Sequence, residues 1–159
     1  MGASALLATV PAAIVLDRPT ITVLGIVTLV VLMALSAFFS SSELALFSLA
    51  RHRIEALADQ GVPGAAAVAD LKADPHRLLI TILVGNNLVN IAMSSIGTAV
   101  FGLYLSRGKA VVAATIGITT LVLLFGESAP KSYAVENTES WSLRIARPLK
   151  WAERLLLPL

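Results

Sequence analysis

Seven residues in three apolar segments carry oxygen atoms that could bind a metal cation. The first segment offers serine hydroxyls, the second offers asparagine carbonyls, and the third offers a carboxylate and a backbone carbonyl. The residues are Ser36, Ser40, Asn86, Asn87, Asn90, Gly126 and Glu127. Hard oxygen donors of this kind suit Mg²⁺ or Ca²⁺ rather than zinc or copper. The chain has no cysteine, so thiolate metal sites and disulfides are excluded.

The spacing of these residues places them on single helical faces. Ser36, Ser40 and Glu43 project within about 60° of one another on a helix, because steps of four and three residues nearly close a turn. The three asparagines of the second segment fall within an arc of about 100°. Counted along each segment at about 1.5 Å per residue, all of these groups reach the same half of a bilayer.

The third segment ends in the stretch FGESAPK, residues 125–131. Pro130 has no amide hydrogen to give to the carbonyl of Gly126, four residues back. A carbonyl freed in this way is tolerated at membrane depth only where it faces protein or a watery cavity. A carboxylate at the centre of a span costs about 2.5 kcal/mol or more. Glu127 is therefore expected to face such an interior, with Lys131 or a bound cation as its partner.

Each polar group also has a structural explanation. Serines in membrane helices commonly bond to their own backbone, and asparagines can join neighbouring helices. Glu127 and Lys131 are four residues apart in the order that favours an ion pair. Glu43 lies close enough to the end of its segment to be a solvated interface residue. The GES string has no partner histidine or second nucleophile within the spans, so the sequence does not predict an enzyme.

The composition indicates which elements hold these groups. The chain is 57% hydrophobic and only 14% charged, unlike an ordinary soluble domain. Three apolar runs approach the length of about 20 residues that a membrane helix needs; they cover residues 20–39 and beyond, 78–105 and 110–126. The predicted fold class is therefore an all-α membrane protein with three transmembrane helices. Two short helices are expected in the loop after the first span, and Gly108 is expected to mark the turn before the third.

The chain divides into three predicted parts. Residues 1–19 form an N-terminal extracellular or interfacial arm, residues 20–137 the three-helix transmembrane domain, and residues 138–159 a juxtamembrane amphipathic (belt) helix. Thr138 is the predicted N-cap of that last helix. Its basic residues fall in one arc of about 120° and its apolar residues in another. This pattern is typical of a helix that lies in the membrane interface, with Trp and Arg as anchors.

The basic residues also predict an orientation. Of the twelve Lys and Arg residues, four lie between the first and second spans and five follow the third. Loops rich in Lys and Arg stay in the cytoplasm. The sequence therefore predicts a multi-pass protein of the cell membrane, with its N-terminus outside and its C-terminus in the cytoplasm.

Three stretches resemble the transmembrane domain of the CorC and cyclin M (CNNM) family of magnesium transporters: LSAFFSSSELALFSLARHRIEAL, DPHRLLITILVGNNLVNIAMSSI and FGESAPKSYA. The resemblance covers residues from about 30 to the C-terminus. It implies a homodimer in the lipid bilayer that exports Mg²⁺ with coupling to Na⁺ entry. It also implies that the ion is held by the small polar residues of the first span, the asparagines of the second and the Glu of the third, with the Gly126 carbonyl as a further donor.

One feature departs from the family pattern. Members of the family continue into cytosolic nucleotide-binding domains, whereas this sequence stops at Leu159 and is expected to be an excised membrane domain. ATP would then act only through domains absent here, and no nucleic-acid partner is predicted. Two other functions fit the same residues. The polar stripes could hold together a membrane scaffold for cytosolic partners, or they could line a passive cation channel.

Overall fold

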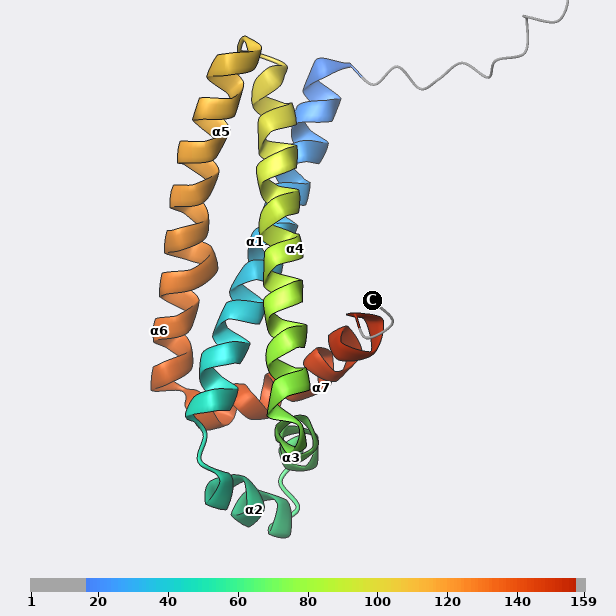
Figure 1. Ribbon diagram of the computed structural model, residues 1–159, viewed down its shortest axis with the longest axis vertical. Coiled ribbons are helices and arrows are strands. Elements are labelled where there is room, and N and C mark those ends of the chain that lie inside the picture. The colour runs from blue at the N-terminus through green and yellow to red at the C-terminus, as the bar shows by residue number, and fades with distance from the viewer. Residues whose placement is uncertain (1–16, 157–159) are drawn as a thin grey trace, which may run out of the picture.

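The computed structural model describes residues 17–156, and every regular element in that range is a helix (Figure 1). Three helical segments are long and apolar enough to cross a membrane, namely Arg18–Ser48, Pro75–Gly102 and Arg107–Glu136. The fold is therefore the all-α membrane protein that the sequence predicts. Residues 1–16, which make up most of the predicted N-terminal arm, lie outside the described residues.

Helix α1, Arg18–Ser48, is the first span and continues through the serine-rich stretch without a break, as expected. It begins two residues before the predicted start at Thr20. Pro19 explains this, because its fixed φ suits the first helical turn, where its missing amide hydrogen is not needed. After α1, the carbonyl of Leu49 accepts a hydrogen bond from Nζ of Lys72. Burial lowers the pKa of this lysine.

Two short helices, α2 (Arg51–Asp59) and α3 (Ala65–Ala73), connect the first and second spans, as predicted. The bend between them uses two glycines with positive φ, Gly61 at 67° and Gly64 at 95°. Gly64 also has no room for a side chain, because an added Cβ would lie 2.5 Å from the carbonyl oxygen of Leu143 in the last helix. The bend can pack against that helix only because this residue is glycine.

Helix α4, Pro75–Gly102, is the second span and starts as predicted. The side chain of Asp74 accepts a hydrogen bond from the amide of Arg77 at 3.0 Å, and Pro75 occupies the first turn. Further along, a Cβ added at Gly85 would lie 2.5 Å from the ring of Phe39 on α1. This close approach packs α4 tightly against α1.

The third span consists of α5 (Arg107–Leu121), the π-helix η1 (Val122–Ser128) and α6 (Ala129–Glu136). The turn before it covers residues 103–106, so Gly108 lies inside the first turn of α5 and the prediction that it marks the turn is wrong. The amides of Leu103 and Tyr104 donate to the carbonyls of Val100 and Phe101 and close the turn without a glycine.

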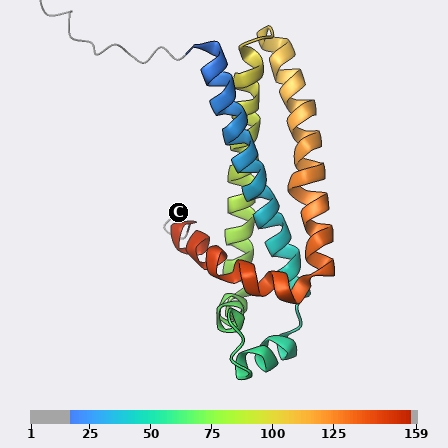
Figure 2. The ribbon, with the colours of Figure 1, turned by 180° about the vertical axis from the view of Figure 1, so that it is seen from behind.

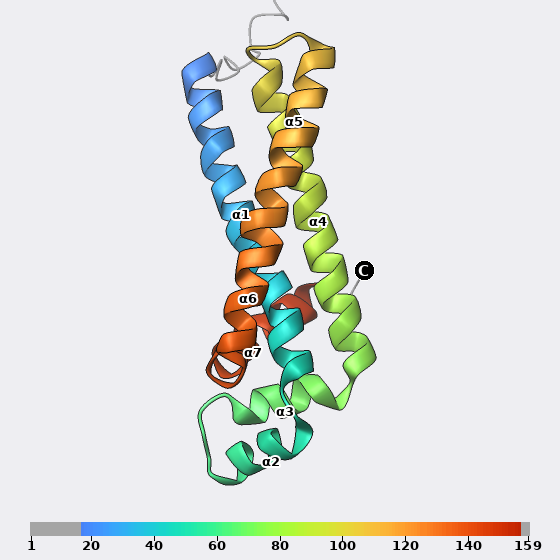
Figure 3. The same cartoon turned by 90° about the vertical axis from the view of Figure 1, so that its left-hand side faces the viewer.

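Helix α7, Thr138–Leu156, crosses one end of the bundle next to α3 (Figures 2 and 3). It starts at the predicted residue, but Thr138 is not its N-cap. The hydroxyl of Thr138 instead donates to the carbonyls of Ala134 and Val135, at 3.0 and 2.9 Å. Only Asn137 separates α6 from α7, so the last carbonyls of α6 still need donors, and Thr138 supplies one.

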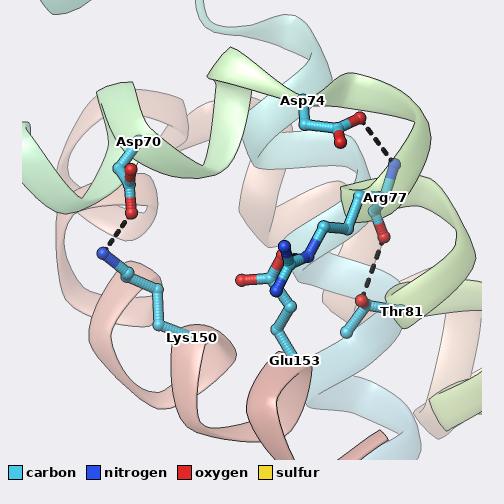
Figure 4. Close-up of polar contacts among 6 residues, drawn as sticks. All are labelled: Asp70, Asp74, Arg77, Thr81, Lys150 and Glu153. Atoms are coloured by element: carbon cyan, nitrogen blue, oxygen red, sulfur yellow. Dashed lines mark hydrogen bonds and ion pairs between the residues drawn. The ribbon is translucent and has the colours of Figure 1, made fainter. Parts of the chain in front are cut away.

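Ion pairs hold α7 to the neighbouring helices (Figure 4). Nε of Arg77 lies 2.6 Å from Oε1 of Glu153, whose side chain is only 14% exposed, and Lys150 pairs with Asp70 on α3. The buried apolar core continues from the spans onto α7 and includes Leu46, Leu78, Ile82, Met93, Ile145 and Leu149. The core and the ion pairs together fix α7 across this end of the molecule, called here the α7 end.

Candidate cation site

Ser36 is the point where the three spans meet. Its side chain is fully buried, and its Oγ lies 3.2 Å from Oδ1 of Asn86 and 3.0 Å from Oδ1 of Asn90. Gly126 of the third span comes so close that an added Cβ would lie 2.9 Å from the same Oγ. Four of the seven predicted site residues therefore meet here, and we call them the Ser36 cluster.

In the Ser36 cluster, two asparagine carbonyl oxygens converge on a single hydroxyl group. A serine hydroxyl has one hydrogen, so Ser36 can donate to only one of the two asparagine carbonyls at a time. The other carbonyl oxygen then faces the serine oxygen without a hydrogen between them. Oxygen atoms that converge in this way are the arrangement that a hard cation stabilises.

Ser40, one turn along α1 from Ser36, is also buried, and its hydroxyl has no hydrogen-bond partner among residues 17–156. A buried polar group without a partner costs free energy and calls for a specific explanation. Ser41 and Ser42 differ, because their hydroxyls donate to the carbonyl of Phe38, at 3.1 and 2.6 Å. The structural explanation for membrane serines thus fits Ser41 and Ser42, whereas Ser40 is left with a hydroxyl that could bind a ligand.

The third span changes its hydrogen-bond register as it passes Ser36. The amide of Ala129 donates to the carbonyl of Leu124, five residues back. The next amide is that of Pro130, which has no hydrogen, so neither the carbonyl of Phe125 nor that of Gly126 receives a bond from it. The spacing of an α-helix identified Gly126 alone. The π-helix, a feature frequent at functional sites, adds Phe125 as a second candidate carbonyl.

Glu127 follows Gly126 directly and lies in the π-helix, half-buried. In the described part of the chain its carboxylate takes part in no ion pair, and its predicted partner is engaged elsewhere: Nζ of Lys131 lies 3.4 Å from Oε2 of Glu43 on α1. Glu43 lies near the end of its span and is partly open to solvent, as expected, but it is also paired, and its side chain is 34% exposed. With Lys131 paired to Glu43, no basic group among residues 17–156 lies within ion-pair distance of Glu127.

Asn87 lies apart from the Ser36 cluster. It is exposed on the surface of α4, and no hydrogen bond joins it to Ser36. Among residues 17–156, no three His, Cys, Asp or Glu side chains gather where they could hold a metal ion. A cation at this place would therefore rely on hydroxyl, amide and backbone oxygens, with Glu127 as the nearby carboxylate.

A groove of about 630 Å³ runs between α1, α4 and the third span, toward the end of the bundle opposite α7. Its lining is entirely apolar and includes Met33, Met93, Gly97, Ile118 and Phe125. No side chain in the groove offers an oxygen to an ion. The polar groups of α1 instead continue from Ser36 through Ser40 to Glu43, toward the α7 end.

Comparisons with known proteins identify one family of membrane domains. The family described as the cyclin M transmembrane N-terminal domain matches residues 26–159. A UPF0053 protein of Haemophilus influenzae is 38% identical over 135 residues, which cover 79% of this chain and 32% of that protein. The UPF0053 inner membrane protein YfjD of Escherichia coli is 38% identical over 125 residues, covering 79% of this chain and 29% of that protein.

A chloroplastic DUF21 domain-containing protein of Arabidopsis thaliana is 36% identical over 135 residues, which cover 82% of this chain and 20% of that protein. The chain thus spans about a third or less of the length of these relatives. The family match over residues 26–159 includes most of the first span, the whole of the second and third spans, and α7.

Proposed function

The chain belongs to the family of cyclin M transmembrane domains, and on this premise we propose that it exports Mg²⁺ in exchange for Na⁺. The observation that carries the proposal is the meeting of two asparagine carbonyls and a serine hydroxyl within 3.2 Å, beside a glycine of the third span. Glu127 and the hydroxyl of Ser40 supply further oxygens close by in the sequence.

The donor set suits a transported ion. Mg²⁺ loses its water reluctantly and prefers six oxygen ligands at about 2.0 to 2.1 Å. Neutral oxygens from Ser36, Asn86 and Asn90 can replace part of its water shell, while one carboxylate neutralises only half of its charge. A site with incomplete neutralisation can release its ion, which a transporter requires and a structural metal site avoids.

The pairing of Lys131 with Glu43 supports exchange with Na⁺. Once Mg²⁺ has left, the carboxylate of Glu127 needs another cation, because Lys131 is already occupied. An uncompensated carboxylate within a membrane span is costly. Na⁺ also prefers oxygen ligands, so it is the proposed replacement at the same place.

The proposed route of Mg²⁺ to the site is based on the difference between the two ends of the bundle. The groove toward the opposite end is apolar, whereas the polar groups of α1 lead toward the α7 end. We place the α7 end in the cytoplasm, because most Lys and Arg residues lie there. In this conformation Mg²⁺ would then enter from the cytoplasm, as export requires.

We further propose that the protein acts as a homodimer. Asn87 exposes an amide on α4, and exposed apolar side chains such as Leu88 and Ile91 surround it. A polar group in a membrane span gains from a protein partner, and a second copy of α4 could supply one. Mass measurement in detergent tests this: a dimer is expected, and a monomer that still transports Mg²⁺ would contradict it.

The transport proposal is tested in liposomes that contain the purified protein and a Mg²⁺-sensitive dye. Glu127→Gln keeps the size of the side chain but removes its charge, and it is expected to abolish Mg²⁺ flux. Glu136→Gln, which changes an exposed carboxylate at the end of the same span, is the matched control and is expected to keep the flux.

Three outcomes separate the alternatives. Normal flux in Glu127→Gln would contradict a transport role for the carboxylate. Flux that is lost with Glu127→Gln but independent of a Na⁺ gradient would favour a passive channel. The absence of Mg²⁺ flux in the parent protein would favour the membrane scaffold.

A further inference from the structure

A small pocket of about 240 Å³ opens on α7, away from the Ser36 cluster. It is lined by Ala67 of α3 and by four residues of α7, namely Arg147, Lys150, Trp151 and Arg154. A concave surface with three basic side chains and one indole calls for an anionic ligand that also has an apolar part.

The charges in this pocket are unequally compensated. Lys150 pairs with Asp70 (Figure 4). Arg147 and Arg154, in contrast, have no carboxylate within ion-pair distance in the described range 17–156. Three arginines at the same end do have carboxylate partners: Arg51 with Glu55, Arg53 with Glu139 and Arg77 with Glu153. The pocket therefore offers two guanidinium groups that have no ion-pair partner in that range, although Arg154 is near enough to Asp70 to help lower its pKa.

Two apolar side chains beside these arginines are largely exposed. Trp151 is 73% exposed and Leu155 is 77% exposed. Arg147, Trp151 and Leu155 follow one another at steps of four residues, so they lie on one stripe of α7. A Trp and a Leu exposed next to Arg are typical of a surface that contacts the headgroup and acyl regions of a bilayer.

The position of α7 gives this stripe access to lipid. The C-terminal half of α7 lies beside the beginning of α4, a membrane span, and its end then slants toward the level of the spans and away from α4 (Figures 1 and 2). The ion pair of Arg77 with Glu153 fixes the two helices in this relation. The pocket is thus held at the boundary where a span leaves the membrane.

We propose that Arg147 and Arg154 bind the phosphate of an anionic phospholipid whose acyl chain lies against Trp151 and Leu155. The planar guanidinium fork matches phosphate oxygens, and basic pockets at the ends of membrane spans bind anionic headgroups. The two exposed apolar side chains favour a lipid over a soluble phosphate. This site is independent of the proposed Mg²⁺ transport.

Quenching of Trp151 fluorescence tests the site in the full chain. Trp141→Phe provides a background in which Trp151 is the only tryptophan, since the chain has two. The protein is placed in vesicles of phosphatidylcholine and phosphatidylglycerol, with bromine on the acyl chains of one lipid at a time. Brominated phosphatidylglycerol is expected to quench several-fold more strongly at equal mole fraction.

The double variant Arg147→Gln, Arg154→Gln is expected to lower the preference for phosphatidylglycerol by roughly fivefold or more. The matched control is Arg107→Gln, Lys109→Gln, which removes two charges at the opposite end and is expected to keep the preference. Equal quenching by both lipids in the parent, or an equal loss in the two double variants, would overturn the proposal. Loss of the preference on adding glycerol phosphate would instead assign the pocket to a soluble phosphate.

Discussion

The two halves of the three-span bundle are built from the same helices but differ in what those helices present to one another. At the α7 end, Gly126 allows the third span to approach Ser36. In the opposite half, Gly97 plays the same part, because an added Cβ would lie 2.7 Å from Ile118. Close packing through glycine is therefore common to both halves. The difference is that close packing buries oxygen atoms around Ser36, whereas around Gly97 it buries carbon atoms.

This difference supports placing the proposed cation site in the half that holds Ser36. An apolar contact such as that of Gly97 with Ile118 leaves no hydrogen-bonding side chain without a partner. At Ser36, by contrast, two carbonyls face one hydroxyl hydrogen, and the neighbouring hydroxyl of Ser40 has no hydrogen-bond partner among residues 17–156. Membrane spans rarely leave buried polar groups unsatisfied unless a ligand or water reaches them.

The largest expected effect is a difference in the reactivity of introduced cysteines between the two ends of the bundle, which we expect on opposite sides of the membrane. The chain has no cysteine, so single introduced cysteines report without background. Arg107→Cys and Lys109→Cys should react fully with an impermeant reagent added outside intact cells. Lys72→Cys and Arg144→Cys should react only after the membrane is opened. The reverse pattern would place the α7 end outside and would contradict export from the cytoplasm.

Asn90→Ala tests the half of the bundle that holds Ser36, called here the polar half. It removes one of the two carbonyls that face Ser36, and the loss of one ligand to a charged group is expected to cost about 1.5 kcal/mol or more. The Kd for Mg²⁺ should then rise roughly tenfold, as measured by calorimetric titration. Ser94→Ala, an exposed position one turn further along α4, is the control and should leave the Kd unchanged. Equal effects of the two substitutions would remove Asn90 from the site.

Gly126→Ala tests whether the polar half requires the third span to approach Ser36 on α1 closely. The added Cβ would lie 2.9 Å from Oγ of Ser36, so the spans must separate, at an expected cost of about 1 to 3 kcal/mol. Gly117→Ala in the same span meets nothing within 4 Å and should be neutral or slightly stabilising. Thermal unfolding in detergent compares the two variants. Equal stability would mean that the helices tolerate separation at Ser36.

The smallest expected effect is a loosening of α7 in acid, while the spans stay intact. The Lys150 ammonium lowers the pKa of Asp70, and the guanidinium of Arg53 lowers the pKa of Glu139. Carboxyls with a lowered pKa stabilise the folded state above their ordinary pKa values. That stabilisation is lost as the pH falls through the lowered values, below about pH 4.

Tryptophan fluorescence follows this change, because both tryptophans lie on α7. The fluorescence should shift in acid while the helix content of the spans stays constant. Because the pairs are exposed, the shift should be modest and should be reduced further by salt. In Asp70→Asn it should be smaller still. A loss of span helicity at the same pH would contradict this separation of α7 from the bundle.

The sequence predicted most of the fold because membrane spans obey simple rules of length and apolar composition. Asp74 and Pro75 identified the start of α4 correctly, and the serine and asparagine stripes identified the residues that meet at Ser36. The pairing of Lys131 with Glu43 escaped prediction. Local spacing favoured Glu127 as the partner of Lys131, whereas the contact with α1 depends on how two distant helices pack.

The π-helix also escaped prediction, for a related reason. Pro130 signalled a missing hydrogen bond but not the register of the helix before it. An α-helix would free the carbonyl of Gly126, whereas in the observed register the carbonyl opposite Pro130, five residues back, is that of Phe125. The choice between the two registers depends on the packing of the third span against α1, which no pattern in the third span records.

The most direct test of the central claim is a calorimetric titration of the purified protein with Mg²⁺, with and without Glu127→Ala. The claim is that the polar half of the bundle is a site for a hard cation, completed by the charge of Glu127. Saturable binding by the parent protein that disappears in a folded Glu127→Ala variant is the predicted result. Identical titration curves for the two proteins, or no binding at millimolar Mg²⁺ by the parent, would contradict the account.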